Sequence, residues 1–514
     1  MVQETQQVSP SASNLESWFE PFRENTIGYH QRFITPFGEK RIVYADWTAS
    51  GRLYQPIEDL LHKEIGPFVG NTHTATSVTG SMMTQAYHKA LKKIKEHVGA
   101  KPSDVIIATN SGMTGVVNKF QRILGLKLHE KYQDKLTLQP NERPVVFVTH
   151  MEHHSNQTSW LETIADLEVI PPDETGLVDL NNLADLLKKY KDRQIKIAAV
   201  TSCSNVTGMF TPYYEIAQMM HENGGLCFVD FAASAPYIHI DMHPENELQK
   251  LDAIYFSPHK FLGGPGSSGV LVFDSKLYKN RVPDNPGGGT VAWTNPWGGH
   301  RYIDEIEARE DGGTPAFLQT MKAAFSIMLK EEMDVNKMLG REEQMMKTIW
   351  ERFDKMQNLH VLADMHRHRL GIFSFYIDNL HYNLAVKLLN DRYGIQTRGG
   401  CSCAGTYGHY LLHVSPQDSK QITEEIDHGD LSHKPGWVRM SIHPTMTDAE
   451  IQYIMDAIEA LCENHRELAK DYHYSNKTNE YIYTGKDDFG PNKVNEWFQK
   501  GFGERDEELG MRDE

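Results

Sequence analysis

The sequence has 514 residues, 39% of them hydrophobic and 24% charged, which is typical of a soluble globular protein with two or three domains. Its 52 Lys and Arg residues against 69 Asp and Glu residues give a formal net charge of −17, which argues against nucleic acid or an anionic membrane as main partner. The polar N-terminus and the lack of a run of about 20 apolar residues predict no signal peptide, no membrane span and a cytoplasmic location. Five cysteines without a Cys-x-x-Cys pair indicate reduced thiols.

The first half of the chain predicts an α/β domain. Residues 1–35 show little pattern, and we expect an N-terminal segment that packs on the later, smaller domain. A long helix is expected from about residue 83 to 97, and apolar strands alternate with helical periods after it. This alternation indicates a mostly parallel sheet of seven strands, covered on both faces, in a large domain at residues 36–315. The expected strands span residues 105–108, 145–148, 167–170, 195–200, 226–229, 253–256 and 270–273.

The second half predicts a smaller α+β domain at residues 316–465. A long helical stretch from 316 to about 356 would link the two domains. Strands are expected at residues 371–377 and 437–442, with a helix after residue 381 and a closing helix at 447–464. Residues 466–514 lose the apolar rhythm, and we expect a charged C-terminal extension to which the sequence assigns no role.

Two residues predict covalent cofactor chemistry. Lys260 lies in a glycine-rich turn, 257–269, between two expected buried strands. Lysine is rarely buried unless paired, so this lysine is either a loop residue at a hairpin tip or a Schiff-base lysine. Asp230 closes the strand at 226–229, and ligands of open α/β sheets bind at such strand ends. Pyridoxal 5'-phosphate needs both groups: an amine for its aldehyde and a carboxylate for its ring nitrogen.

An aspartate at a strand end followed some thirty positions later by Ser-x-His-Lys resembles the class V aminotransferase superfamily, and within it the cysteine desulfurases. The resemblance runs from about residue 44 to 462 and implies the fold-type I architecture of pyridoxal phosphate enzymes, with a seven-stranded large domain and a smaller α+β domain. It implies that Lys260 binds the cofactor aldehyde, that Asp230 pairs with the ring nitrogen, and that Ser257 and His259 hold the phosphate.

Further motifs match the same superfamily. The turn at 110–115 follows the first strand of the sheet and opens a helix, where the family holds the phosphate with residues matching Gly112, Met113 and Thr114. Glycine there could equally serve only to turn the chain. The Glu-His-His-x-Asn motif at 152–156 implies that His153 stacks on the cofactor ring. A metal site is the alternative for these histidines, but no second cluster completes a tetrahedral set, so we expect no metal.

Two more segments carry roles by resemblance, and a third position departs from the desulfurase pattern. The Ser-Asn-x-x-Gly turn at 204–208 places Asn205 beside the cofactor phenolate and the substrate carboxylate. Desulfurases have a glutamine three positions after the aspartate that hydrogen-bonds the phenolate, whereas this chain has Ala233 there. Ser234 or Asn205 could take over the contact of that glutamine. The segment ending in Thr314 resembles a Glu-x-Gly-Thr-Pro motif that reaches the phosphate of the neighbouring subunit, which implies a homodimer with shared active sites.

The stretch 398–405 suggests sulfur chemistry. It resembles the desulfurase motif Arg-x-Gly-x-x-Cys-Ala and the Arg-x-Gly-Cys-x-Cys form of molybdenum cofactor sulfurases, and both place Cys403 at the nucleophile position. A thiolate on a glycine-rich loop can attack the sulfur of a cysteine substrate. The alternatives are a zinc site formed by the Cys401-x-Cys403 pair with His409 and His413, or cysteines with no role in sulfur chemistry.

The strand at 437–442 carries Arg439, which spacing alone would make an exposed strand arginine. The family's Arg-x-Ser strand implies instead that Arg439 binds the α-carboxylate of an amino acid substrate. The resemblance as a whole implies a pyridoxal phosphate enzyme that converts L-cysteine into L-alanine and a Cys403 persulfide, with a possible protein acceptor for the sulfur. The alternatives are a C–S lyase, an epimerase or a transaminase acting on another amino acid, and a non-catalytic or sulfur-carrier scaffold.

Overall fold

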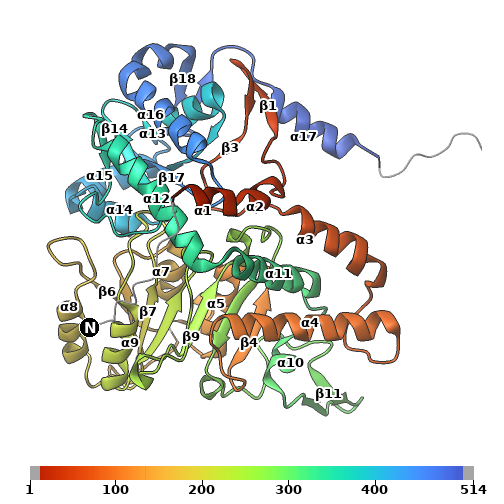
Figure 1. Cartoon of the computed structure of the whole chain (residues 1–514). Coiled ribbons are helices and arrows are strands. Elements are labelled where there is room, and N and C mark those ends of the chain that lie inside the picture. The colour runs from red at the N-terminus through yellow and green to blue at the C-terminus, as the bar shows by residue number, and fades with distance from the viewer. Residues whose placement is uncertain (1–11, 134, 502–514) are drawn as a thin grey trace, which may run out of the picture.

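A seven-stranded sheet forms the centre of the larger half of the molecule in this computed structural model, which describes residues 12–133 and 135–501 (Figure 1). The strand order is β4-β10-β9-β8-β7-β5-β6. Strand β10 is antiparallel to both of its neighbours and the other pairs are parallel, so the predicted seven strands and mostly parallel arrangement are confirmed. The strands are β4 (Val105–Thr109), β5 (Val145–Thr149), β6 (Asp166–Ile170), β7 (Lys196–Thr201), β8 (Leu226–Asp230), β9 (Ala253–Phe256) and β10 (Gly269–Phe273).

Helices cover both faces of this sheet. One face packs against α4 (Val78–His97), α9 (Tyr213–Glu222) and α11 (Phe317–Met333), and the other against α5 (Gly112–Ile123) and α7 (His154–Leu161). Strands β5, β7, β9 and β10 are buried along their whole length, which explains why their sequences read as continuous apolar runs. Helix α4 starts five residues before the predicted position because Ser77 caps it, accepting the Gly80 N–H.

The predicted helical stretch over 316–356 is two helices. Helix α11 ends at Met333 and α12 (Val335–Phe353) begins directly after Asp334, whose φ of +67° interrupts the helical backbone. The Asp334 carboxylate then caps α12 by accepting the N–H groups of Asn336 and Lys337 at 3.0 and 3.3 Å. Apolar periodicity continues through this point, so the pattern alone cannot locate the break.

The second sheet has four antiparallel strands in the order β13-β14-β17-β16. Its core also contains Phe22 of the N-terminal helix α2 (Glu20–Glu24) and the fully buried Phe19, which joins α2 to helix α1 (Ala12–Trp18). Figure 1 shows these red helices beside the green helix α12 and the blue C-terminal elements. The remaining elements of this half are β3 (Val43–Tyr44), β13 (Leu359–Val361), β14 (Ile372–Ile377), α13 (Tyr382–Leu388), β15 (Ile395–Gln396), β16 (Arg398–Gly400), β17 (Trp437–Ser441) and α16 (Asp448–Leu468).

The chain after α16 forms a hairpin and a further helix. Strands β18 (Tyr472–Ser475) and β19 (Glu480–Tyr483) form a hairpin that packs on α13. Asn479 donates to the hydroxyl of Tyr382 in α13 at 2.7 Å, and the Tyr472 hydroxyl donates to Asp391, in the turn after α13, at 2.9 Å. The hairpin is therefore part of the smaller half, and α17 (Phe489–Gln499) follows it and projects from the body (Figure 1).

Shorter elements complete the described chain. They are β1 (Arg32–Thr35), β2 (Gly38–Arg41), α3 (Gln55–Asp59), α6 (Glu130–Gln133), α8 (Leu180–Lys189), β11 (Val291–Thr294), β12 (His300–Tyr302), α10 (Ile306–Glu310), α14 (Gly405–Leu411) and α15 (Pro416–Asp427). Within the described ranges, none of the helices is both long and apolar enough to span a membrane.

Candidate active site

A cavity of about 240 Å³ lies at the carboxyl ends of the parallel strands, where the second sheet closes over the first. The turns after β4, β5, β7, β8 and β9 line it from one side, and residues of the smaller half line it from the other. The cavity brings together 11 of the 12 predicted site residues, and Thr314 is the exception. Those 11 are Gly112, Met113, Thr114, His153, Asn205, Asp230, Ser257, His259, Lys260, Cys403 and Arg439.

The cavity floor holds the half-buried side chain of Lys260 and the buried acid Asp230. Lys260 ends the short turn after β9, and burial lowers the pKa of its amine to about 8, although the nearby Asp230 opposes this shift. Asp230 ends β8, and burial raises the pKa of its carboxyl to about 6, against the effects of the Ala232 N–H, which donates to it at 2.8 Å, and of Lys260. Each group stabilises the charged form of the other in a site that disfavours both charges.

The start of helix α5 forms a cradle of N–H and hydroxyl groups. Gly112 has a φ of +58°, and the next N–H, from Met113, donates to the Ser257 hydroxyl at 2.8 Å. A Cβ on Gly269 would lie 2.2 Å from the Gly112 backbone, so β10 approaches this turn as closely as glycine allows. Unpaired amides at the positive end of a helix dipole suit a phosphate group.

The three histidines after β5 lie in different environments. His153 lines the cavity, and its Nδ1 accepts the Ser155 N–H at 3.1 Å. Burial, with the charge of Lys260, lowers its pKa to about 3, so its ring is neutral. His150 contacts a backbone carbonyl oxygen at 3.0 Å, and the ring of His154 accepts a backbone N–H at 2.9 Å. No three metal-binding side chains come together among the described residues.

The Cys403 loop is held by its backbone. Ser402 and Cys403 both have left-handed backbone angles, with φ of 51° and 56°. The amide of Asn205 donates to the Ser402 carbonyl and the His154 N–H donates to the Cys403 carbonyl, both at 2.8 Å. Cys403 is exposed and also lines the cavity, whereas Cys401 is half-buried and does not. The loop therefore places the second of the two thiols at the cavity wall.

Arg398 is a charged residue of the cavity wall that was not predicted from the sequence as a site residue. Arg398 lines the cavity beside Arg439, and the two share one carboxylate, that of Asp46. Arg439 Nη2 lies 2.9 Å from one oxygen of Asp46, and Arg398 Nε lies 3.0 Å from the other. Arg398 and Asp46 occur within the motifs that carry the resemblance, but no signal in the sequence joins positions 352 residues apart.

The structure distinguishes between the two candidates to replace the missing glutamine. Ala233 lines the cavity as expected, but the Ser234 hydroxyl is fully buried and hydrogen-bonds the Ser202 hydroxyl at 2.5 Å. Asn205 lines the cavity, and its Oδ1 is buried without a hydrogen-bond partner in the described part of the chain. A buried polar atom left unpaired at a cavity indicates that a ligand completes it.

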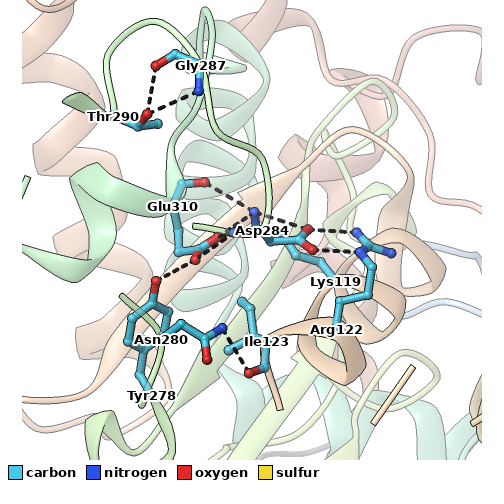
Figure 2. Close-up of polar contacts among 9 residues, drawn as sticks. All are labelled: Lys119, Arg122, Ile123, Tyr278, Asn280, Asp284, Gly287, Thr290 and Glu310. Atoms are coloured by element: carbon cyan, nitrogen blue, oxygen red, sulfur yellow. Dashed lines mark hydrogen bonds and ion pairs between the residues drawn. The ribbon is translucent and has the colours of Figure 1, made fainter. Parts of the chain in front are cut away.

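Thr314 lies on an exposed segment outside the cavity, and a buried ionic cluster anchors this segment to α5 (Figure 2). Glu310, four residues earlier, contacts the amine of Lys119 at 2.8 Å with both side chains almost fully buried. Asp284 accepts two hydrogen bonds from Arg122 at 2.7 and 2.8 Å. The same helix therefore provides the phosphate cradle at its start and the anchor for this segment further along.

The sequence matches the family Aminotransferase class-V over residues 43–454. This chain belongs to the class V aminotransferase family. Two curated relatives are named probable cysteine desulfurases. The protein from Staphylococcus epidermidis is 27% identical over 372 residues, and that from Halalkalibacterium halodurans is 26% identical over 369 residues. Each alignment covers 71% of this chain and 84% of the relative.

Solved structures share the fold. A cysteine desulfurase from Thermococcus onnurineus has a TM-score of 0.68 at 20% identity, covering 87% of this chain and 98% of that one. The cysteine desulfurase CsdA from Escherichia coli has a TM-score of 0.66 at 19% identity, covering 89% and 99%. Class V aminotransferases are pyridoxal phosphate enzymes, so this chain is an enzyme with that cofactor.

The cavity fits the cofactor on features of its own. The α5 cradle suits its phosphate, the Lys260 amine at the cavity suits its aldehyde, and the buried carboxyl of Asp230 suits its ring nitrogen. The unpaired Oδ1 of Asn205 leaves a polar atom for a bound ligand to satisfy.

Proposed function

We propose that this class V aminotransferase is a cysteine desulfurase, which converts L-cysteine into L-alanine and leaves a persulfide on Cys403. One observation carries the proposal: the exposed thiol of Cys403 lines the same cavity as the half-buried Lys260 and the buried Asp230. The names of the curated relatives support it. The reaction balances without an oxidant, because the S–S bond forms as the Cβ–S bond of the substrate breaks, and the thiol proton of Cys403 is matched by a new proton on Cβ.

The cofactor, when bound, supplies an electron sink for the bonds at the α-carbon of the substrate. Lys260, with a pKa near 8, can carry a proton to and from that carbon at neutral pH. Cys403 supplies the sulfur nucleophile from the loop at the wall. We propose that Arg439 and Asn205 bind the substrate carboxylate, which would orient the amino acid between these two groups.

The remaining roles are proposals of the same kind. Asp230 would pair with the ring nitrogen, and the neutral His153 ring would stack on the cofactor and fix its plane. The phosphate would be held by Gly112, Met113, Thr114, Ser257 and His259.

We also propose an assembly and a location. Thr314 is exposed outside its own cavity, in keeping with a homodimer in which it would reach the phosphate of the second subunit. The enzyme would act in the cytoplasm and pass its sulfur to an acceptor, as the resemblance of its Cys-x-Cys loop to molybdenum cofactor sulfurases suggests. We divide the chain into an N-terminal segment (1–35), a cofactor domain (36–315), a linking and small domain (316–465) and an extension (466–514).

Replacing Cys403 with alanine tests the function. The purified variant should keep the absorption band of the bound cofactor but form no alanine and no persulfide from L-cysteine. The matched control is Cys401→Ala, which alters the neighbouring thiol outside the cavity wall and should retain turnover. Unchanged alanine and sulfide release by Cys403→Ala would reject the desulfurase, and a keto acid or racemised product would indicate a transaminase or an epimerase.

A further inference from the structure

Asp46 lies behind the two arginines of the cavity wall. It is 8% exposed and does not line the cavity, whereas Arg398 and Arg439 do. Its backbone is fixed to the second sheet, because it bridges Ser441 in β17 and the Ser441 hydroxyl accepts the Thr48 N–H at 2.9 Å. The carboxylate is therefore held in place while the two guanidinium groups present their other donors.

The arginines keep donors free for a ligand. A guanidinium has five N–H donors. Arg439 donates to Asp46 at 2.9 Å and to the Asn205 carbonyl at 3.2 Å, and its buried Nε has no partner among the described residues. The Arg398 side chain is 52% exposed and contacts Asp46 through Nε. The Asp46 carboxylate therefore accepts only some of the N–H donors of the two guanidinium groups.

The net charge of Arg398, Arg439 and Asp46 indicates which substrates this wall can match. Two guanidinium charges and one carboxylate leave a single net positive charge at this wall, which matches an amino acid with one carboxylate and an uncharged side chain. Without Asp46 the wall would carry two positive charges, enough to match two carboxylates. One elementary charge several Å away changes binding by about tenfold to a hundredfold at an effective dielectric constant of about 20.

We propose that Asp46 determines specificity by neutralising one of the two arginines, so that the cavity favours amino acids with one carboxylate over dicarboxylic ones. The inference rests on the proposed function, because it takes the arginine wall as the site of the substrate carboxylate. A purely structural role for Asp46 predicts something different: its removal would weaken the binding of all amino acids to the same extent.

The test compares L-aspartate with L-asparagine, which are close in shape and differ by one charge. Dissociation constants are measured on the holoenzyme by calorimetry and by the change in cofactor absorption. The quantity of interest is the affinity for L-aspartate relative to L-asparagine. We expect Asp46→Asn to raise this ratio by about tenfold or more over wild type. A ratio within about twofold of wild type, or no binding of L-aspartate to either protein, overturns the inference.

Two further variants test the charge argument separately from folding. Arg398→Gln removes one positive charge, so it should lower the ratio, and the double variant Asp46→Asn, Arg398→Gln should return it towards wild type. If Asp46→Asn does not fold, Arg398→Gln decides the question, and an unchanged ratio there overturns the inference. The ratio of the affinities for L-aspartate and L-asparagine involves no sulfur chemistry. Failure of the proposed function would therefore appear in a different assay, as wild-type enzyme that forms no alanine from L-cysteine.

Discussion

Replacing Asp230 with asparagine should stabilise the cofactor-free protein. The Asp230 side chain is buried, and burial raises its pKa from 3.8 to about 6. An acid whose pKa is higher in the folded chain than in the unfolded chain destabilises the fold once it ionises. Each pKa unit corresponds to about 1.4 kcal/mol, so the ionised carboxylate costs the folded state about 3 kcal/mol at pH 7. Asparagine has nearly the same shape and carries no charge.

The pH dependence of this difference follows from the same shift. Between pH 3.8 and 6 the folded state keeps a proton on Asp230 that the unfolded chain has lost. The stability contributed by this proton is therefore fully present below pH 3.8 and is lost as the pH rises to 6. The advantage of Asp230→Asn should be absent near pH 4, about half of its full value at pH 5, and constant above pH 6.

Denaturation of the two cofactor-free proteins at pH 5 and pH 7.5 measures this advantage. The difference between wild type and variant isolates position 230, because all other titrating groups are shared. The holoenzyme should show the opposite effect, since asparagine cannot pair as a carboxylate with a protonated ring nitrogen, and the variant should lose cofactor more readily. A cofactor-free variant that is no more stable than wild type at pH 7.5, or equally stabilised at both pH values, would refute the reasoning.

Three other substitutions give separate expectations. Glu310→Ala removes the nearer carboxylate from the buried Lys119 amine, leaves only Asp284 at 3.7 Å, and should cost about 3 kcal/mol in urea denaturation; a loss below about 1 kcal/mol would contradict a buried ion pair. Gly269→Ala places a Cβ 2.2 Å from the Gly112 backbone and should abolish cofactor retention on gel filtration, so a fully loaded variant would be evidence against the cradle. Burial raises the pKa of Glu342 from 4.5 to about 8, so Glu342→Gln should match wild type near pH 4.5, gain thermal stability over wild type as the pH rises, and reach its full advantage above pH 8; an advantage that does not change between pH 5 and pH 8 would contradict the raised pKa.

The large sheet and the cofactor side of the cavity follow from local sequence. Most of its strands are short apolar runs between turn residues, and strands buried on both faces read in this way. Parallel strands bring their carboxyl ends to one edge, so Gly112, His153, Asn205, Asp230 and Lys260 could be expected to meet there.

The other side of the cavity depends on contacts that no local pattern encodes. Asp46 meets Arg439 across 393 positions, and the contact depends on how the turn after β3 aligns with β17. The β18–β19 hairpin was also missed, because its buried positions are Tyr472 and the polar Asn479, which give no apolar alternation. Asn479 is buried only because hydrogen bonds to α13 satisfy it.

The N-terminal helices have a consequence for how the polypeptide is made. Arg23 donates to the backbone carbonyl of Thr445 at 3.0 Å, across 422 positions, and Phe19 is buried in the core shared with the C-terminal helix α16. A ribosome adding about 5–20 residues per second needs roughly 20 to 80 seconds to reach that partner. During this interval the apolar rings of the N-terminal segment lack the surface against which they pack in the folded protein. We therefore expect chaperones to bind this segment during synthesis.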